Sequence, residues 1–590
     1  MKVLQRAMTG LVAIAAVIAL QAQANAQVLK HVRDDALVVI KLNNAQAVND
    51  KLVAMSQKMG LANLHPAAAN PLGVLQQQLN LKQGLNLKGE TALVVFAPIA
   101  GENEPRAMAL IPVADYKAFL TNFADVKKDG EADTFALQAD GEPLFAEQWG
   151  EYAAITPWKD LLAEKPQGLQ VNGVIAKQFQ EKDLTVYVSL KPVREKILPQ
   201  VQQIRQMLEN MPAADNPGGG MPGAFQKAMG VHMLAGVESF LTQTQASALS
   251  LNVTPAGVSS TLSVEFDAAS PWGKSIQTVE NTDAALLAGL PQDNYLAFAG
   301  VSLSGGRLWS LFNAMYSEPM KAVKLDEADT KSLQAAMAGY EKMLTAMNRM
   351  TFALVTPPAG TPPTAGLLRA VTIIDGDAKT LLSANQAVME NQNAFMKATG
   401  TPGISMKTSF QPNAKTLDSV SLGQFTTEVA IDTNAGVDPT AAQILQFFYG
   451  KGMSILIGAV NDKTVVSGLG VDDAQLQKTI ATAKQGQAPL STDAAIKNVA
   501  KELPQKRFAV GYVAVANMIT TGLDIASQLG AAPPIKLPAD LPPVGVSAAT
   551  EGSALRFDAH IPSPLIEALV STGLQMAMQK AQQQKPAGGL

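Results

Sequence analysis

The chain has 590 residues, of which 47% are hydrophobic, 16% charged and 5% aromatic, and its formal net charge at pH 7 is −4. The apolar fraction is too high for a disordered chain, and the length suffices for several domains of about 150 residues. Without a basic excess, nucleic-acid binding is not expected. Because the sequence contains no cysteine, disulfides, thiol catalysis, cysteine-ligated zinc and iron–sulfur clusters are excluded.

The N-terminal segment has the three parts of a secretory signal peptide. Lys2 and Arg6 supply a positive region, residues 7–20 are uncharged and largely apolar, and residues 24–26 (Ala-Asn-Ala) fit a cleavage site. The apolar stretch is shorter than the roughly 20 residues that a membrane span requires. We therefore expect cleavage before Gln27 rather than a retained anchor. No later stretch approaches a membrane span, so the sequence predicts a secreted protein, in the periplasm or outside the cell.

The first half of the chain alternates strand and helix patterns. The run 36–40 (Ala-Leu-Val-Val-Ile) predicts a buried strand, and residues 45–60 have helical spacing. Further elements are expected in this order: strands at 91–97 and 107–113, a helix capped by Asp115, short strands at 134–137, 143–148 and 152–156, a helix at 158–164, a strand at 183–190, a helix at 193–209, a loop at 212–223, and a hairpin at 248–253 and 259–267.

A similar order returns in the second half. The expected elements are a strand at 294–301 followed by a helix through Leu308, strands at 351–356 and 367–374, a helix opened by Asp377, strands within 416–431 and at 453–460 and 463–469, a helix at 472–484, a strand at 507–513, a helix to Leu529, and a hairpin at 544–550 and 553–561. Proline-rich residues 533–543 precede that last hairpin.

Short similarities recur in one order along the two halves. Four pairs of segments match: 91–95 with 351–355, 115–120 with 377–382, 172–177 with 494–499, and 262–271 with 555–564. We therefore predict an α+β fold of two homologous halves, each a mostly antiparallel sheet with helices packed on one face. The predicted division is a signal peptide (1–26), a first half (27–280), a second half (281–565), and a helix end with a flexible tail (566–590). Within that tail, residues 580–590 have no apolar face and are expected to be mobile.

Motifs for nucleotide, acyl or metal chemistry are missing from the sequence. Nothing fits a P-loop or a G-x-S-x-G elbow, and the glycine-rich run 300–306 lacks dinucleotide spacing, so we interpret it as a turn. The four histidines, none with an i, i+4 partner, are interpreted as structural: His31, His65, His232 and His560. The sequence thus offers no catalytic, cofactor-binding or metal-binding residues.

Paired aspartates are interpreted as turns and helix caps. Asp375 and Asp377 could begin a calcium loop, but the later oxygen ligands are missing, so a turn and N-cap are expected. Asp472 and Asp473 fit a helix start, and residues 34–35 fit a solvated turn.

After the signal-like segment, four stretches resemble large secreted bacterial proteins of unknown function with strand–helix repeats. They are 36–42 (Ala-Leu-Val-Val-Ile-Lys-Leu), 91–96, 112–120 and 149–156. The resemblance covers most of the chain and implies neither an activity nor functional residues.

Two classes of function stay open. The first is a non-catalytic envelope or extracellular protein that binds or scaffolds through a surface or a groove between the halves; its partner would be an apolar or peptide ligand or another envelope protein, with no cofactor and no nucleic acid. The alternative is an exported hydrolase whose carboxylate or serine site is assembled by the fold. The shortage of catalytic motifs favours the non-enzyme.

Overall fold

The structure is a computed structural model. It describes residues 27–583 except 64–65, 100–103, 137–141, 213–222, 324, 359, 362–365, 393, 396–403, 432–447, 451, 529–536 and 539. The predicted signal peptide, most of the loop 212–223 and residues 584–590 of the predicted tail therefore lie outside the described residues. Residues 580–583 of that tail belong to a helix.

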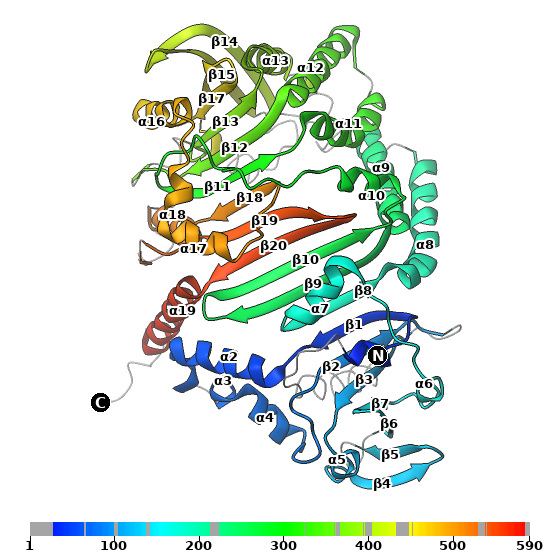
Figure 1. The fold of residues 1–590 in the computed structure, drawn as a ribbon. Helices are drawn as coiled ribbons and strands as arrows, with labels where there is room; N and C mark the ends of the chain where they lie inside the picture. Colours follow the sequence, from blue (N-terminus) through cyan, green and yellow to red (C-terminus); the bar gives the residue numbers. More distant parts are fainter. Residues whose placement is uncertain are drawn as a thin grey trace. The chain divides into compact units, whose positions relative to one another are not determined.

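The chain divides into two compact units. Unit 1 contains residues up to 198, residues 241–278 and residues from 550 onward, and unit 2 contains 199–240 and 279–549. These boundaries differ from the sequence halves, because 199–240 packs with the second unit and 550–583 with the first. Figure 1 follows the elements along the chain.

Unit 1 contains an antiparallel sheet in which, among the described residues, eleven strands are paired. In sheet order they are β4 (Ala124–Asp129), β5 (Ala132–Ala136), β6 (Leu144–Trp149), β7 (Tyr152–Thr156), β3 (Arg106–Pro112), β2 (Thr91–Phe96), β1 (Ala36–Leu42), β8 (Leu184–Ser189), β9 (Thr244–Thr254), β10 (Gly257–Phe266) and β20 (Ala554–Pro562). The last strand comes from the far end of the sequence and pairs with β10 from Gly257 opposite Pro562 to Glu265 opposite Ala554.

The strands of unit 2 are also paired antiparallel, and nine of them lie in its described part. In sheet order they are β14 (Ile404–Leu417), β15 (Val420–Ile431), β16 (Gly452–Asn461), β17 (Thr464–Leu469), β13 (Ala370–Gly376), β12 (Met347–Val355), β11 (Tyr295–Ser302), β18 (Ala509–Val513) and β19 (Val544–Glu551).

The strands of the two units have the same order. Strands β1 to β9 and strands β11 to β19 occupy the same successive places, so that the first strand of each set lies between the second and the eighth. The fourth to seventh strands form a meander beside the third in both units. The α+β class and the mostly antiparallel sheets are therefore confirmed.

Helices follow the strands in each unit. Those that begin in unit 1 are α2 (Ala45–Lys58), α3 (Pro66–Ala69), α4 (Pro71–Gln78), α5 (Tyr116–Leu120), α6 (Asp160–Ala163), α7 (Gly173–Glu181), α8 (Leu190–Asn210), α10 (Pro271–Gln277) and α19 (Ser563–Gln583). Those that begin in unit 2 are α9 (Gly223–Gln243), α11 (Gly305–Lys321), α12 (Glu327–Ala346), α13 (Ala378–Glu390), α16 (Asp473–Lys484), α17 (Ala494–Lys501) and α18 (Val515–Gln528). A short 3₁₀ helix, η1 (Gln27–His31), opens the described chain.

The aspartates interpreted as helix caps have that role. The carboxylates of Asp115, Asp377 and Asp472 accept the backbone N–H groups of Ala118, Thr380 and Gln475. Each cap satisfies a donor that the first turn of a helix leaves without an intrahelical partner.

Hydrophobic clusters lie on both faces of the unit 1 sheet, whereas helices were expected on one face. On one face, residues of β2 and β3 pack with Leu161 of α6 and Phe179 of α7. On the other face, Leu93 and Ile155 pack with Leu72 of α4 and Phe119 of α5. The expectation failed because α4, which the sequence patterns did not reveal, and α5 both pack on this second face.

Candidate functional site

One face of the unit 1 sheet carries polar side chains in the protein interior. Lys41, Thr185, Ser250, Thr261 and Asp558 are direct neighbours across β1, β8, β9, β10 and β20. Each is at most 6% exposed. We call this side of the four strands β8, β9, β10 and β20 the polar face.

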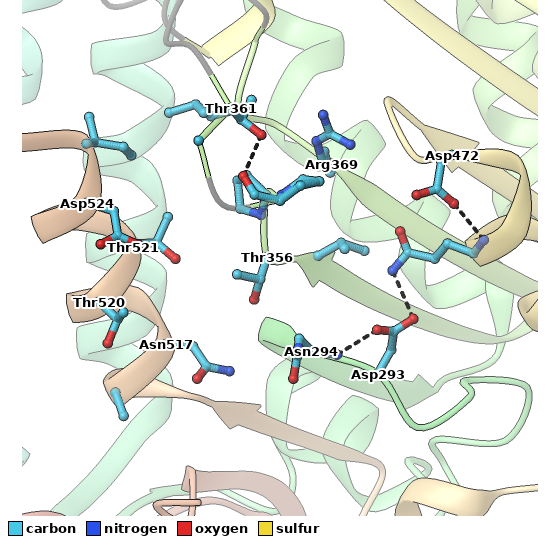
Figure 2. A pocket seen from close by; sticks show the side chains of 18 of the residues that line it. Asp293, Asn294, Thr356, Thr361, Arg369, Asp472, Asn517, Thr520, Thr521 and Asp524 are labelled. Atoms are coloured by element: carbon cyan, nitrogen blue, oxygen red, sulfur yellow. Dashed lines mark hydrogen bonds between the residues drawn. The ribbon is translucent and has the colours of Figure 1, made fainter. Parts of the chain in front are cut away.

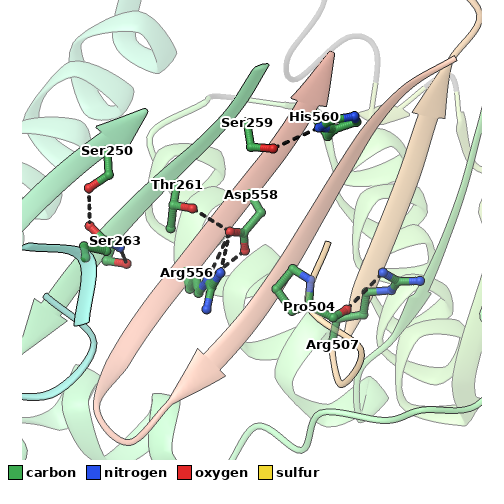
Figure 3. Close-up of polar contacts among 10 residues, drawn as sticks. Ser250, Ser259, Thr261, Ser263, Pro504, Arg507, Arg556, Asp558 and His560 are labelled. Atoms are coloured by element: carbon green, nitrogen blue, oxygen red, sulfur yellow. Dashed lines mark hydrogen bonds and ion pairs between the residues drawn. The ribbon is translucent and has the colours of Figure 1, made fainter. Parts of the chain in front are cut away.

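The polar face is held together by hydrogen bonds, several of which appear in Figure 3. The Ser250 hydroxyl donates to Gln178 of α7 at 3.0 Å, and Gln178 donates in turn to Ser263. On the neighbouring strands, Thr261 donates to the Asp558 carboxylate at 2.7 Å, which also pairs with Arg556 at 2.8 Å. Buried polar groups with such partners are stable in a protein interior.

Lys41 ends the row of polar side chains at β1. Its ammonium forms an ion pair with Glu90 at 2.7 Å and donates to the carbonyl of Phe179. Burial lowers the pKa of Lys41, and the nearby Glu90 carboxylate opposes that shift. The second oxygen of Glu90 accepts the backbone N–H of Val28 at 3.1 Å, so this pair also fixes η1.

The opposite side of the same strands is apolar and exposed. Its central row is Ile40, Val186, Leu249, Leu262 and Phe557, again direct neighbours across the five strands. Leu249, Leu262 and Phe557 are 45%, 39% and 44% exposed. Large apolar side chains gathered at this exposure mark interaction surfaces more often than packing defects.

We call this side the open face. Its residues are Leu184, Val186, Val188, Ser247, Leu249, Leu251, Val253, Val258, Ser260, Leu262, Val264, Leu555, Phe557, Ala559 and Ile561. None of them is charged. The backbone N–H and C=O groups of these strands are hydrogen-bonded to neighbouring strands. A ligand on the open face can therefore contact only side chains.

Helices bury the same row of side chains further along the sheet. Beyond Ile40 the row continues through Leu93, Ala109 and Ile155, which are at most 5% exposed. There α4 and α5 cover it. The open face is therefore the part of a single apolar sheet surface that the described residues leave uncovered.

Unit 2 contains a polar pocket of about 570 Å³, drawn in Figure 2. Its carboxylates are Asp293, Asp472 and Asp524. Asp293 accepts the backbone N–H of Asn294 and the side-chain amide of Gln475, and Asp472 caps α16. Among the described residues that line it there is no serine, histidine or other activated nucleophile. The pocket can bind polar groups, but its geometry shows no acid–base pair.

A second pocket of about 1040 Å³ in unit 2 is lined by Asp375 and Asp377, the pair considered for a calcium loop. Asp375 pairs with Arg349 and accepts the Thr464 hydroxyl. Hydrogen bonds to Thr380 lower the pKa of Asp377. Across the part of the chain that the structure describes, no group of three histidine or acidic residues could hold a metal ion.

The histidines lie apart from one another in the described chain. His31 packs against the ring of Tyr152 in unit 1, and burial lowers its pKa. His560 lies on the polar face, where its Nδ1 and the Ser259 hydroxyl are 2.9 Å apart. His232 is on α9, and His65 lies outside the described residues.

The glycine-rich run 300–306 joins β11 to α11. A Cβ at Gly300 would lie 2.0 Å from the carbonyl of Leu286, and one at Gly305 would lie 1.7 Å from that of Leu344. Close backbone packing accounts for these two glycines, in line with the turn interpretation.

Sequence reasoning did not identify the open face. The signal was present in the strict alternation of Leu249, Ser250 and Leu251, but alternation does not tell which side a sheet buries.

Comparison of the chain with protein-family models, with curated proteins and with solved structures found no match. No helix in the described part of the chain is long and apolar enough to cross a bilayer.

Proposed function

We propose that this protein is an exported binding protein, without catalytic activity, whose open face takes up the acyl chains of a lipid. The observation that carries the proposal is the open face itself, an uncharged apolar surface over four strands. Acyl chains need no hydrogen bonds, and each methylene taken out of water contributes about 0.8 kcal/mol.

An extended peptide fits this surface less well. Peptides in an extended conformation bind by pairing with a free strand edge. Within the open face, β8, β9 and β10 each have two strand neighbours. A peptide laid on these strands would lose backbone hydrogen bonds to water without replacement.

The export part of the proposal rests on the first 26 residues. Mass analysis of the protein recovered from the producing cells tests it directly. A mature chain that begins at Gln27 is the expected result, and an intact Met1 would contradict it.

We infer further that the two units arose by duplication. The shared order of nine strands supports this, as do the caps at Asp115 and Asp377, which open the helix after the third strand of each set. The likeness to large secreted bacterial proteins with strand–helix repeats stays a prediction.

Lipid binding can be measured with the chain that begins at Gln27 and a dansyl-labelled fatty acid. Saturated fatty acids that differ by two carbons would compete with it. We expect affinity to rise with length by up to about fifteenfold per two carbons, because the methylenes leave water. Affinity that does not change with chain length would contradict the proposal.

Two double variants, one on the open face and one elsewhere, test whether the lipid binds at the open face. Leu249→Ser with Leu262→Ser removes apolar surface from the open face and should weaken binding at least tenfold. Met315→Ser with Met518→Ser removes two similarly exposed side chains from α11 and α18 and should leave binding unchanged. Equal loss in both variants would exclude the open face as the site.

The second candidate is an exported hydrolase, and the three carboxylates of the unit 2 pocket favour it. Screening the purified protein against esters, peptides and glycans tests it. Turnover that disappears in Asp293→Asn or Asp524→Asn would establish it in place of pure binding.

A further inference from the structure

The polar pocket of unit 2 has features that packing does not explain. It lies where three neighbouring strands of the sheet meet the loops at their ends. Asn294 precedes β11, Thr356 follows β12 and Arg369 precedes β13. Figure 2 shows Asn517, Thr520, Thr521 and Asp524 of α18 on the opposite side. At about 570 Å³ its size is that of pockets for small organic ligands, about 300–1,000 Å³.

The Arg369 side chain has no hydrogen bond or ion pair to a described residue. Its Nε is buried without a partner, as are those of Arg106 and Arg205, but those two guanidiniums pair with carboxylates. Every other arginine of the described chain interacts with a carboxylate, a carbonyl or another group of the protein. By contrast, Arg349 on the neighbouring strand β12 pairs with Asp375. An arginine that lines a pocket and lacks an internal partner points to a ligand that supplies an anionic group.

A second buried group in the same pocket also lacks a partner. The hydroxyl oxygen of Thr356 is buried and has no hydrogen bond to a described residue. Thr356 and Arg369 line one wall of the pocket. Buried polar atoms in folded proteins nearly always have partners, so two orphans on one wall indicate that part of the site is completed by a ligand.

The charges of the lining restrict the ligand. Asp293, Asp472 and Asp524 outnumber the two cations, Arg369 and Lys478. A phosphate dianion would be repelled by this excess of carboxylates. A single carboxylate can accept two parallel hydrogen bonds from the guanidinium of Arg369. A cationic group on the same ligand could pair with Asp524, which has no described partner.

We propose that this pocket binds a zwitterion, a free amino acid or a short peptide. The ligand carboxylate lies against Arg369 and Thr356, and its ammonium group lies toward Asp524. The site is separate from the open face and does not depend on lipid binding there.

The site is tested by isothermal titration calorimetry of the protein that begins at Gln27. The ligands are the dipeptide alanyl-alanine and a panel of free amino acids. The C-terminal amide of the dipeptide lacks the carboxylate, and its N-acetyl form lacks the ammonium. We expect at least one zwitterion to bind, and both blocked forms to bind at least tenfold more weakly than the free dipeptide. Failure of every zwitterion to bind, or binding of inorganic phosphate in their place, overturns the proposal.

Two variants assign the ends of the ligand. Arg369→Gln should abolish the preference for the free carboxylate over the amide, and Asp524→Asn should abolish the preference for the free ammonium over the N-acetyl form. Lys501→Gln, an exposed change on α17 outside the pocket, should leave both preferences intact. Thermal melting confirms that each variant folds. Preferences that survive in a folded Arg369→Gln protein overturn the assignment.

Discussion

The polar face and the open face belong to the same four strands, and they reverse the usual pattern of a sheet. Ordinarily the buried side is apolar and the exposed side polar. Here Ser250 and Thr261 are buried while their sequence neighbours Leu249 and Leu262 are exposed. The polar side is stabilised by specific partners, and the apolar side has none within the described chain. The difference teaches that period-two patterning records two different surfaces of a sheet without telling which of them the fold buries.

The largest effect on this comparison should come from Lys41, which ends the row of buried polar side chains on β1, next to the polar face. Lys41→Met leaves the Glu90 carboxylate largely buried without its cation and should lower the free energy of unfolding by about 3–5 kcal/mol. Lys58→Met is the control, because Lys58 pairs with Glu567 in a more exposed position and should cost about 1 kcal/mol or less. Urea unfolding measures both, and equal losses would contradict the buried role of Lys41.

A smaller loss is expected from Asp558→Asn. The change removes the charge that Arg556 and Thr261 contact but keeps an oxygen acceptor, so the expected loss is about 1.5–3 kcal/mol in total. The adjacent Phe557→Ser lies on the open face and should cost about 1 kcal/mol, since its ring is nearly half exposed already. If Phe557→Ser proved the more damaging of the two, the polar face would not be the structural side of the sheet.

The open face should affect surface properties more than stability. Leu249→Ser with Leu262→Ser should reduce the fluorescence of a bound hydrophobic dye severalfold and lower self-association at high protein concentration. Sedimentation and dye titration measure this, with Met315→Ser plus Met518→Ser as the control. An unchanged dye signal would mean that the open face is not accessible in solution.

The smallest effect is a dependence of stability on pH through Glu265, at the end of the polar face. Burial raises its pKa above the usual 4.5. The folded state therefore binds more protons than the unfolded state between pH 4.5 and the raised pKa, so stability falls as pH rises through that window. Glu265→Gln should remove this fall and stabilise the protein at neutral pH. Urea midpoints over a pH series would show it, and a steeper fall in the variant would contradict the sign.

Much of the secondary structure could be predicted from sequence patterns. The strands near 36–40, 91–97 and 183–190 and the helix starts at Asp115 and Asp377 were correct within a few residues. These signals are local, because alternation and caps depend on neighbouring residues. Less local elements were missed. The strand β4 has charged, exposed residues, and β14 begins at Ile404, twelve residues before the predicted strand.

The residue matches between the halves show that sequence similarity did not give the correct alignment of the strands. Matching 91–95 to 351–355 equates Leu93 with Ala353. Leu93 packs toward α4 and α5, whereas Ala353 packs toward α16 and α17, which correspond in chain order to α6 and α7. The match is therefore shifted by one residue, which reverses the faces of a strand. Similar residues on both sides of a buried strand make such a shift invisible in the sequence.

The candidate sites were beyond sequence reasoning for a related reason. Whether Leu249 is covered depends on helices that are distant in the chain, and whether Arg369 finds a carboxylate depends on how three strand ends meet. Neither has a local signature.

The pairing of β10 with β20 joins residues about 300 positions apart, and this has a consequence for biosynthesis. A chain made from its N-terminus completes β1 to β10 long before β20 exists. Until then β10 has an unpaired edge, and Thr261 lacks the carboxylate to which it donates. A chain that stops short of residue 550 would keep that edge and could pair with another copy of itself. The pairing of β10 therefore depends on a chain that extends through β20, almost to the end of the sequence.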